Sequence, residues 1–150
     1  MSGRLAGRGA VVTGAGRGIG LAIVAPLASE GAQVAALDLD PAAAAENGAA
    51  LCIPCNVADS ASLAAALAQA RSHFGRLDIA VANAGIGKAA HDGSDELYAA
   101  MAQRNGELAA TGTSSTHVDQ LIHMQDDGWR GVMAVNLDGT FFLARGFTRI

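Results

Sequence analysis

The chain has 150 residues, of which 51% are hydrophobic and 4% aromatic, and its formal net charge is −4. This length accommodates one domain whose core is built from small aliphatic side chains. The acidic balance and the lack of a basic run exclude nucleic acids and anionic membrane surfaces as expected partners. No long apolar region follows the N-terminal residues, so we expect neither a signal peptide nor a membrane span, and a cytoplasmic location.

The apolar residues Ala10 to Val12 predict a strand that runs directly into a glycine-rich turn. Glycines permit a tight turn and the close approach of a ligand, and the first N–H groups of a following helix point toward an anion. A strand, a glycine-rich turn and a helix in this order therefore predict a phosphate-binding site. The turn reads Thr13-Gly14-Ala15-Gly16-Arg17-Gly18-Ile19-Gly20.

Apolar residues at helical spacing predict a helix from Ile19 to Leu27 that ends before Gly31. The next apolar strand, Val34 to Leu37, ends in Asp38, 18 positions after Gly20. A carboxylate at about this distance from the glycine turn meets the adenosine ribose of a bound dinucleotide.

Asp38 also bears on the choice of nicotinamide cofactor. A carboxylate accepts hydrogen bonds from the ribose hydroxyls of NAD and repels the 2′-phosphate of NADP. Leu39 and Asp40 add no positive charge, so NAD is favoured over NADP. Arg17, inside the turn, is the nearby basic residue, and both a solvated side chain and recognition of a 2′-phosphate stay open for it.

Two cysteines, Cys52 and Cys55, lie on a third apolar segment. A C-x-x-C pair can be redox-active when one thiol lies at a helix N-terminus. Residues three apart on an extended strand are about 10 Å apart, which is too far for a disulfide. We therefore predict buried, unreactive thiols.

Strands and helices alternate through the first half of the chain. After Asp59 a helix pattern runs through Leu63 to Phe74 and ends at Gly75, and Leu77 to Ala82 is the fourth apolar strand. Nearly continuous apolar strands predict a parallel sheet covered on both faces. Right-handed crossovers give the strand order 3-2-1-4, an incomplete Rossmann-like, doubly wound α/β fold whose ligands bind at the carboxyl ends of the strands.

The glycine turn does not fit G-x-G-x-x-G but fits T-G-x-x-x-G-x-G, which resembles the short-chain dehydrogenase/reductase family. Three later segments strengthen this resemblance. Asn56-Val57 stands where the family usually has Asp-Val, Ala82-Asn83-Ala84-Gly85 is similar to its N-N-A-G element, and Val132 to Phe141 resembles its helix with a catalytic asparagine.

The resemblance implies that Asn136 is a catalytic residue. We expect no metal site, because a zinc ion bound by Cys52 and Cys55 would need a second ligand pair, and His117 and His123 are joined by no further ligand. It implies cofactor binding by twelve residues, namely Gly14, Arg17, Gly18, Ile19, Gly20, Asp38, Leu39, Asn56, Val57, Asn83, Ala84 and Gly85.

The resemblance further implies hydride transfer between NAD and a small alcohol or ketone. In the family a tyrosine acts as the base, a lysine four residues later lowers its pKa, and a serine orients the substrate oxygen. Here the sole tyrosine is Tyr98, the residue four positions later is Ala102, and the sole lysine is Lys88. We therefore expect a truncated enzyme that is catalytically incomplete; a non-catalytic dinucleotide sensor and an inactive fragment are the alternatives. For a full-length form the resemblance implies a homo-oligomer, a tetramer or a dimer.

The interval between Gly85 and Asn136 is about twice the usual length in the family, which predicts an insertion at about 87–127 within a single domain spanning 1–150. This segment holds seven of the 14 acidic residues. Ser94-Asp95-Glu96 predicts the start of a helix that runs to Ala110, and a second helix is predicted to start near Asp126. A lid over the substrate and a surface elaboration at a subunit contact both stay open for the insertion.

Overall fold

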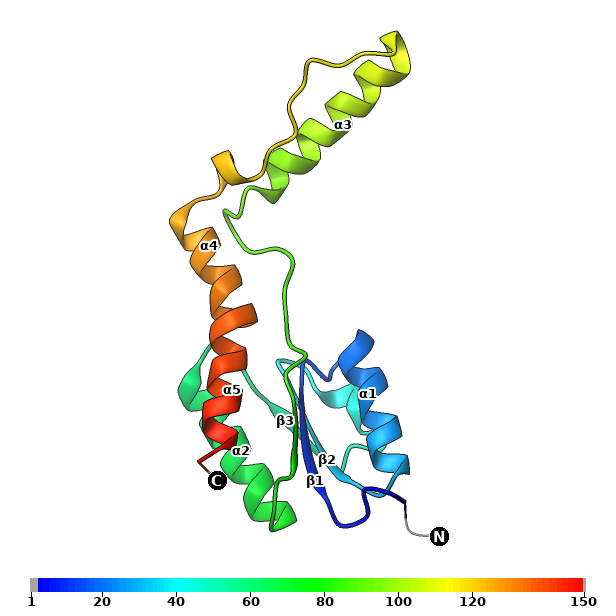
Figure 1. Cartoon of the computed structure of the whole chain (residues 1–150), viewed down its shortest axis with the longest axis vertical. Coiled ribbons are helices and arrows are strands. Elements are labelled where there is room, and N and C mark those ends of the chain that lie inside the picture. The colour runs from blue at the N-terminus through cyan, green and yellow to red at the C-terminus, as the bar shows by residue number, and fades with distance from the viewer. Residues whose placement is uncertain (1–2, 150) are drawn as a thin grey trace. The chain divides into compact units, whose positions relative to one another are not determined.

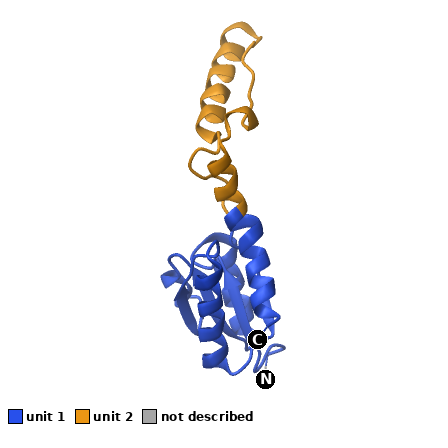
Figure 2. Ribbon diagram, turned by 90° about the vertical axis from the view of Figure 1, so that its left-hand side faces the viewer, with its two compact units in different colours: residues 1–85, 134–150 blue, residues 86–133 orange. Residues whose placement is uncertain are grey.

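The computed structural model describes residues 3–149 and separates the chain into two compact units (Figure 2). Unit 1 comprises residues 1–85 and 134–150, and unit 2 comprises residues 86–133. Residues 1, 2 and 150, the ends of the predicted domain, lie outside the described residues. Unit 2 overlaps the segment that the sequence analysis treats as an insertion.

Unit 1 is built on a four-stranded parallel sheet. Its strands, in the spatial order β3-β2-β1-β4, are β1 (Gly9–Thr13), β2 (Gln33–Asp38), β3 (Leu51–Pro54) and β4 (Ile79–Val81). Val11 at the centre of β1 is in register with Ala35 of β2 and Ala80 of β4. The order 3-2-1-4 and the α/β class are thus confirmed.

Helices cover both faces of this sheet, which explains its uninterrupted apolar strands (Figure 1). The helix α1 (Gly18–Ser29) packs on the face that carries Ala10 and Val12. On the opposite face, α2 (Ser60–Phe74) and α5 (Gly139–Phe147) pack over Val11. A short 3₁₀ turn, η1 (Ala42–Ala44), lies between β2 and β3.

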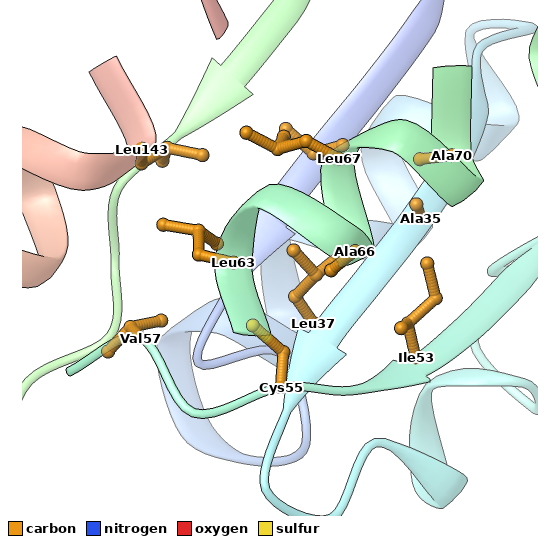
Figure 3. Packing of buried hydrophobic residues seen from close by; sticks show 11 residues of the cluster. Ala35, Leu37, Ile53, Cys55, Val57, Leu63, Ala66, Leu67, Ala70 and Leu143 are labelled. Carbon is orange, nitrogen blue, oxygen red and sulfur yellow. The ribbon is translucent and has the colours of Figure 1, made fainter. Parts of the chain in front are cut away.

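The larger core cluster lies beneath α2 and α5. Figure 3 shows Leu63 and Leu67 of α2 gathered with Leu37 of β2 and Leu143 of α5. All four of these leucine side chains are buried. Two glycines allow α5 to approach closely, because a Cβ at Gly139 would lie 3.0 Å from Val57 Cγ2 and one at Gly146 would lie 2.6 Å from Leu67 Cδ1.

The predicted boundaries of α2 are confirmed by its caps. The Asp59 carboxylate accepts a hydrogen bond from the Ala61 N–H at 2.8 Å, which is a standard N-cap. Gly75 ends the helix with a left-handed backbone, φ +75°, which glycine adopts without a steric penalty.

The fourth strand is shorter than the sequence pattern predicts, Ile79–Val81 in place of Leu77 to Ala82. At each end, a side chain accepts a hydrogen bond from a backbone N–H of the neighbouring strand or of the following segment. The N–H of Gly9 donates to the Asp78 carboxylate at 3.0 Å, and the N–H of Asn83 donates to Thr13 Oγ1 at 3.1 Å. Asp78 also pairs with Arg76 and Arg8, and these bonds hold the pKa of its carboxyl well below its usual range.

The helix predicted around Asn136 contains an irregularity. Between α4 (Asp126–Met133) and α5 lies a π-helical turn, η3 (Ala134–Asp138), with Asn136 at its centre. Such wide turns occur frequently at functional sites. The sequence pattern indicated helix here but not the change of pitch.

Unit 2 contains α3 (Ser94–Thr111), the short turn η2 (Leu121–His123) and α4. Gly93, at φ +77°, occupies the N-cap position of α3, so Ser94 is the first helical residue rather than the cap. The buried Asp92 accepts hydrogen bonds from the N–H groups of Ala89 and Ser94 at 2.8 and 2.9 Å. Gln120 donates to the carbonyl of Asp92 at 3.0 Å and thereby ties η2 to the start of α3.

Across residues 3–149, we find no helix with the length and apolar character that crossing a bilayer requires.

We predict that Leu63→Ala destabilises unit 1 by about 2–5 kcal/mol, because it opens a cavity in the main core. Leu63 is 0% exposed, whereas Leu121 in η2 is 74% exposed. The control Leu121→Ala, which removes the same atoms from an exposed site, should change the stability by no more than about 0.5 kcal/mol. Urea unfolding monitored by circular dichroism measures both. Equal losses in the two variants would contradict this core assignment.

We predict a pH-dependent contact in unit 2 between His91 Nδ1 and Asp127 Oδ2, which lie 2.8 Å apart. The hydrogen bond to Asp127 and its charge raise the pKa of His91 above 6.5. The contact therefore stabilises unit 2 below about pH 6.5 and is lost as the pH rises through the raised pKa of His91. An NMR titration of His91 should give a midpoint above 6.5 that falls in Asp127→Asn. An unchanged midpoint would exclude this pairing.

Candidate functional site

The glycine-rich turn links β1 to α1 and takes a shape that other residues would not allow. Gly14 has φ +66° and Gly18 has φ +55°, both left-handed. A Cβ at Gly14 would lie 2.7 Å from Ala84 Cα, and one at Gly20 would lie 2.0 Å from the Gly14 carbonyl oxygen. The turn is therefore packed directly against the segment that follows β4.

Thr13 and Asn83 join the carboxyl ends of β1 and β4. The Thr13 hydroxyl accepts hydrogen bonds from the N–H groups of Asn83 and Ala84 at 3.1 and 3.2 Å and donates to the Val81 carbonyl at 3.3 Å. In return, Asn83 Nδ2 donates to the carbonyls of Thr13 and Gly14, both at 3.1 Å. Thr13 is not among the site residues predicted from the sequence; its place at the head of the glycine motif was the available signal.

Asp38 holds the other side of the turn. Its carboxylate accepts hydrogen bonds from the Gly16 N–H at 2.9 Å and from the Asp40 N–H at 3.1 Å. A Cβ at Gly16 would lie 2.9 Å from Asp38 Cγ and 2.2 Å from the Asp40 carbonyl oxygen. Gly16 is therefore a positioning residue, although it is not among the site residues predicted from the sequence.

The N-terminus of α1 has no side-chain cap. Arg17 occupies the N-cap position with an extended backbone and makes no capping hydrogen bond. The first N–H groups of a helix have no partner within it, so they are oriented to receive an anion. Two large apolar side chains are exposed here. Ile19, at the start of α1, is 75% exposed, and Leu39, directly after β2, is 76% exposed.

Asn136 lies against the end of β4 within unit 1. A Cβ at Gly85 would lie 3.3 Å from Asn136 Oδ1, so this glycine leaves room for the amide. Thr140 Oγ1 donates a hydrogen bond to the Asn136 carbonyl at 3.1 Å. The structure thus brings Asn136 beside the Asn83–Gly85 segment.

Asn56 and Val57 follow β3 at the same edge of the sheet, but their side chains make local and core contacts. Asn56 Oδ1 accepts a hydrogen bond from the Ala58 N–H at 3.1 Å, and its own N–H donates to Ser62 Oγ at 3.1 Å. Val57 is buried against Gly139 of α5. Of the two, the exposed Asn56 is the one whose side chain is accessible to a ligand.

Cys52 and Cys55 are free thiols, and Cys55 is buried. Burial raises the pKa of the Cys55 thiol, which keeps it in the unreactive protonated form. Cys52 is only partly buried, so the prediction of buried thiols is confirmed for Cys55 and is wrong for Cys52.

The parallel sheet in the order 3-2-1-4 with helices on both faces defines a Rossmann-like α/β architecture. The chain belongs to the short-chain dehydrogenase family, whose model, described as short chain dehydrogenase, matches residues 8–150.

The alignments with individual relatives cover nearly all of this chain, and the chain spans only about half of each relative's length. The D-threitol dehydrogenase of Mycolicibacterium smegmatis is 34% identical over 150 residues, 95% of this chain and 46% of the relative. The (3R)-3-hydroxyacyl-CoA dehydrogenase of Mus musculus is 37% identical over 91% of this chain and 48% of the relative. The crystal structure of 3-ketoacyl-(acyl-carrier-protein) reductase from Brucella melitensis, complexed with NADH, has a TM-score of 0.67 and 26% identity over 94% of this chain and 49% of that one.

We predict that Thr13→Val loosens the junction between β1 and β4. The substitution keeps the shape of the side chain but leaves the N–H groups of Asn83 and Ala84 without an acceptor. The expected loss of stability is about 1–3 kcal/mol. Hydrogen exchange of these two amides should accelerate, and urea unfolding should report the loss of stability. Thr13→Ser, which retains the hydroxyl, serves as the control. Equal exchange rates in Thr13→Val and the unmodified chain would contradict the claim that the Thr13 hydroxyl joins β1 to β4.

Proposed function

We propose that unit 1 binds NAD as the cofactor-binding part of an oxidoreductase that interconverts secondary alcohols and ketones. One observation carries this proposal. Hydrogen bonds from Asp38 and Asn83 hold the glycine turn at Gly14 to the strand ends, next to the uncapped N-terminus of α1. The family assignment supports it, because the matched relatives are dehydrogenases and reductases.

The turn fits a pyrophosphate group. Gly14, Gly16 and Gly20 all lie where a Cβ would collide with neighbouring atoms, so the backbone itself forms the surface of the turn. A pyrophosphate would meet the N–H groups at the start of α1, from Gly18 onward. The neighbouring Ile19 and Leu39 expose apolar surface that a planar ring system would cover.

Asp38 supports NAD over NADP. Each carboxylate oxygen has two lone-pair sites, and the hydrogen bonds to Gly16 and Asp40 use one site on each oxygen. The remaining sites can accept the ribose hydroxyls, whereas a 2′-phosphate would be repelled. Asn56 can accept from the adenine amino group, as the family resemblance suggests.

The bound nicotinamide would supply the hydride chemistry. From this chain, Asn136 would hold a water at the end of β4, as in the family. The sole tyrosine and the sole lysine of this chain do not have the spacing of the family's catalytic pair. Tyr98 and Lys88 lie in unit 2, where Lys88 Nζ bonds to Asp95 at 2.6 Å and lies 5.9 Å from the Tyr98 ring centroid. We infer that the 150 residues alone bind the cofactor without turnover.

The substrate class follows from the relatives' names. D-threitol and (3R)-3-hydroxyacyl-CoA both carry a secondary alcohol, and this group is the one we assign to the substrate of the whole enzyme. We assign the whole enzyme a cytoplasmic location and a homo-oligomeric state on the same family resemblance.

We predict that the chain binds NAD more tightly than NADP and that Asp38→Ala weakens NAD binding by about 1–3 kcal/mol, since it removes the ribose acceptor. Isothermal titration calorimetry on the folded chain measures both affinities. The matched control, Asp40→Ala, removes a carboxylate two residues away and should leave NAD affinity nearly unchanged. The proposal fails if a folded chain binds neither dinucleotide, or if both variants lose affinity equally.

A further inference from the structure

Unit 2 contains no buried hydrophobic side chain among the described residues. Its buried positions are Asp92, Gly93, Ser94 and Gly128, whereas every buried hydrophobic side chain that the structure describes belongs to unit 1. A segment of this size normally needs apolar burial, a disulfide or a metal to hold a defined structure. Unit 2 holds neither of the two cysteines, and the described residues contain no cluster of metal-ligating side chains. Polar contacts therefore hold unit 2 in its fold.

The chain enters and leaves the greater part of unit 2 at one point. Residues 94–119, the α3 module, contain α3 and the segment that returns from its C-terminus. At the base of this module, Ser94 Oγ and the Asp92 carbonyl both accept hydrogen bonds from Gln120 Nε2, at 3.2 and 3.0 Å. A Cβ at Gly93 would lie 2.5 Å from the Gln120 carbonyl oxygen. Asp92, Gly93, Ser94 and Gln120 thus close the module, and we call them the Asp92 clasp.

The carboxylate of Asp92 is the centre of this clasp. Its residue is 2% exposed, and it accepts hydrogen bonds from the N–H groups of Ala89 and Ser94 at 2.8 and 2.9 Å. The bonds from Ala89 and Ser94 lower the pKa of Asp92, so the carboxylate keeps its charge at neutral pH. Without this carboxylate, two backbone N–H groups would lose their acceptor at the base of the module.

Polar bonds also fasten the return segment to α3. Residues 112–119 run back alongside the helix (Figure 1). Arg104 Nη1 donates to the Thr116 carbonyl at 3.0 Å, and the Glu107 carboxylate accepts from the hydroxyls of Ser114 and Thr116 at 2.5 and 2.7 Å. Water competes for such exposed or partly exposed bonds, so each contributes little net free energy.

The exposed apolar side chains of α3 add little to its stability. Tyr98, Met101 and Leu108 are 60%, 43% and 40% exposed, so folding removes only part of their surface from water. With 18 residues, α3 is close to the length at which an isolated helix becomes marginal in water, and Gly106 in its interior weakens it further. The helix therefore depends on the clasp at its N-terminus and on the return segment along its side.

We propose that the Asp92 clasp is an order–disorder switch for the α3 module. While the clasp is closed, α3 and the return segment are folded; when it opens, both unfold and the sheet core of unit 1 stays folded. Opening breaks a few polar bonds and uncovers no buried hydrophobic side chain, so it requires less free energy than unfolding of unit 1. A ligand or partner that binds the folded module would shift this equilibrium toward the closed clasp. The switch does not depend on cofactor binding.

Hydrogen exchange of the whole chain under native conditions, measured for each segment by mass spectrometry, tests this switch. Asp92→Ala should accelerate exchange in α3 at least about tenfold and leave the strands of unit 1 unchanged. Gly93→Ala should have the same effect without a change of charge, because its Cβ would overlap the Gln120 carbonyl at φ +77°. The matched control, Asp126→Ala, removes a carboxylate that is 89% exposed and pairs with Arg130, and it should leave exchange in α3 unchanged.

A stabilising variant tests the same equilibrium from the other side. A Cβ at Gly106 would meet no atom within 4 Å, so Gly106→Ala should favour the folded helix and slow exchange in α3 about fourfold. The proposal is overturned if α3 in the unmodified chain exchanges like an unfolded peptide, or if Asp92→Ala and Gly93→Ala both leave its exchange unchanged. Equal acceleration in α3 and in the strands of unit 1 would also overturn it, because the module would then not unfold separately.

Discussion

The hydrogen bonds between Thr13 and Asn83 join the carboxyl ends of β1 and β4, and the candidate site is arranged around that junction. They use a buried hydroxyl and a side-chain amide, so each group satisfies backbone N–H or C=O groups that two diverging strand ends would leave unpaired. With the strand ends held together, Gly14 and Gly20 can lie against the segment after β4. The start of α1 then faces the same edge of the sheet as Asp38 and Gly85.

At this edge of the sheet, glycine allows neighbouring chain segments to pack closely, and this matters more than its backbone flexibility. At Gly16 and Gly20 the missing Cβ leaves space for the atoms of a neighbouring chain segment, and at Gly85 for the Asn136 amide. The same device recurs away from the site, where Gly139 and Gly146 let α5 approach Val57 and Leu67. Because α5 follows directly on η3, this close packing also places Asn136. The core and the candidate site therefore depend on the same helix.

The two units differ in how they are stabilised. Unit 1 buries apolar side chains on both faces of its sheet, whereas unit 2 relies on polar bonds around Asp92 and Glu107. Such bonds contribute modest net free energy, because the unfolded chain makes equivalent bonds to water. The residues implied in cofactor binding all belong to unit 1, and the sole tyrosine and lysine belong to unit 2.

Local patterns in the sequence were sufficient to predict the strand order, the limits of α2 and the helix at Ser94, because apolar periodicity, an Asp N-cap and a glycine C-cap act over a few residues. Motif resemblance likewise indicated the family. The role of Thr13, the short fourth strand and the π-helical turn at Asn136 were not predictable in this way. The first two depend on partners far apart in the sequence, namely Asn83 for Thr13 and Gly9 for Asp78. The sequence alone thus determined the elements and their class, and the tertiary structure decided which hydrogen bonds those elements exchange, because only folding brings distant donors and acceptors within about 3 Å.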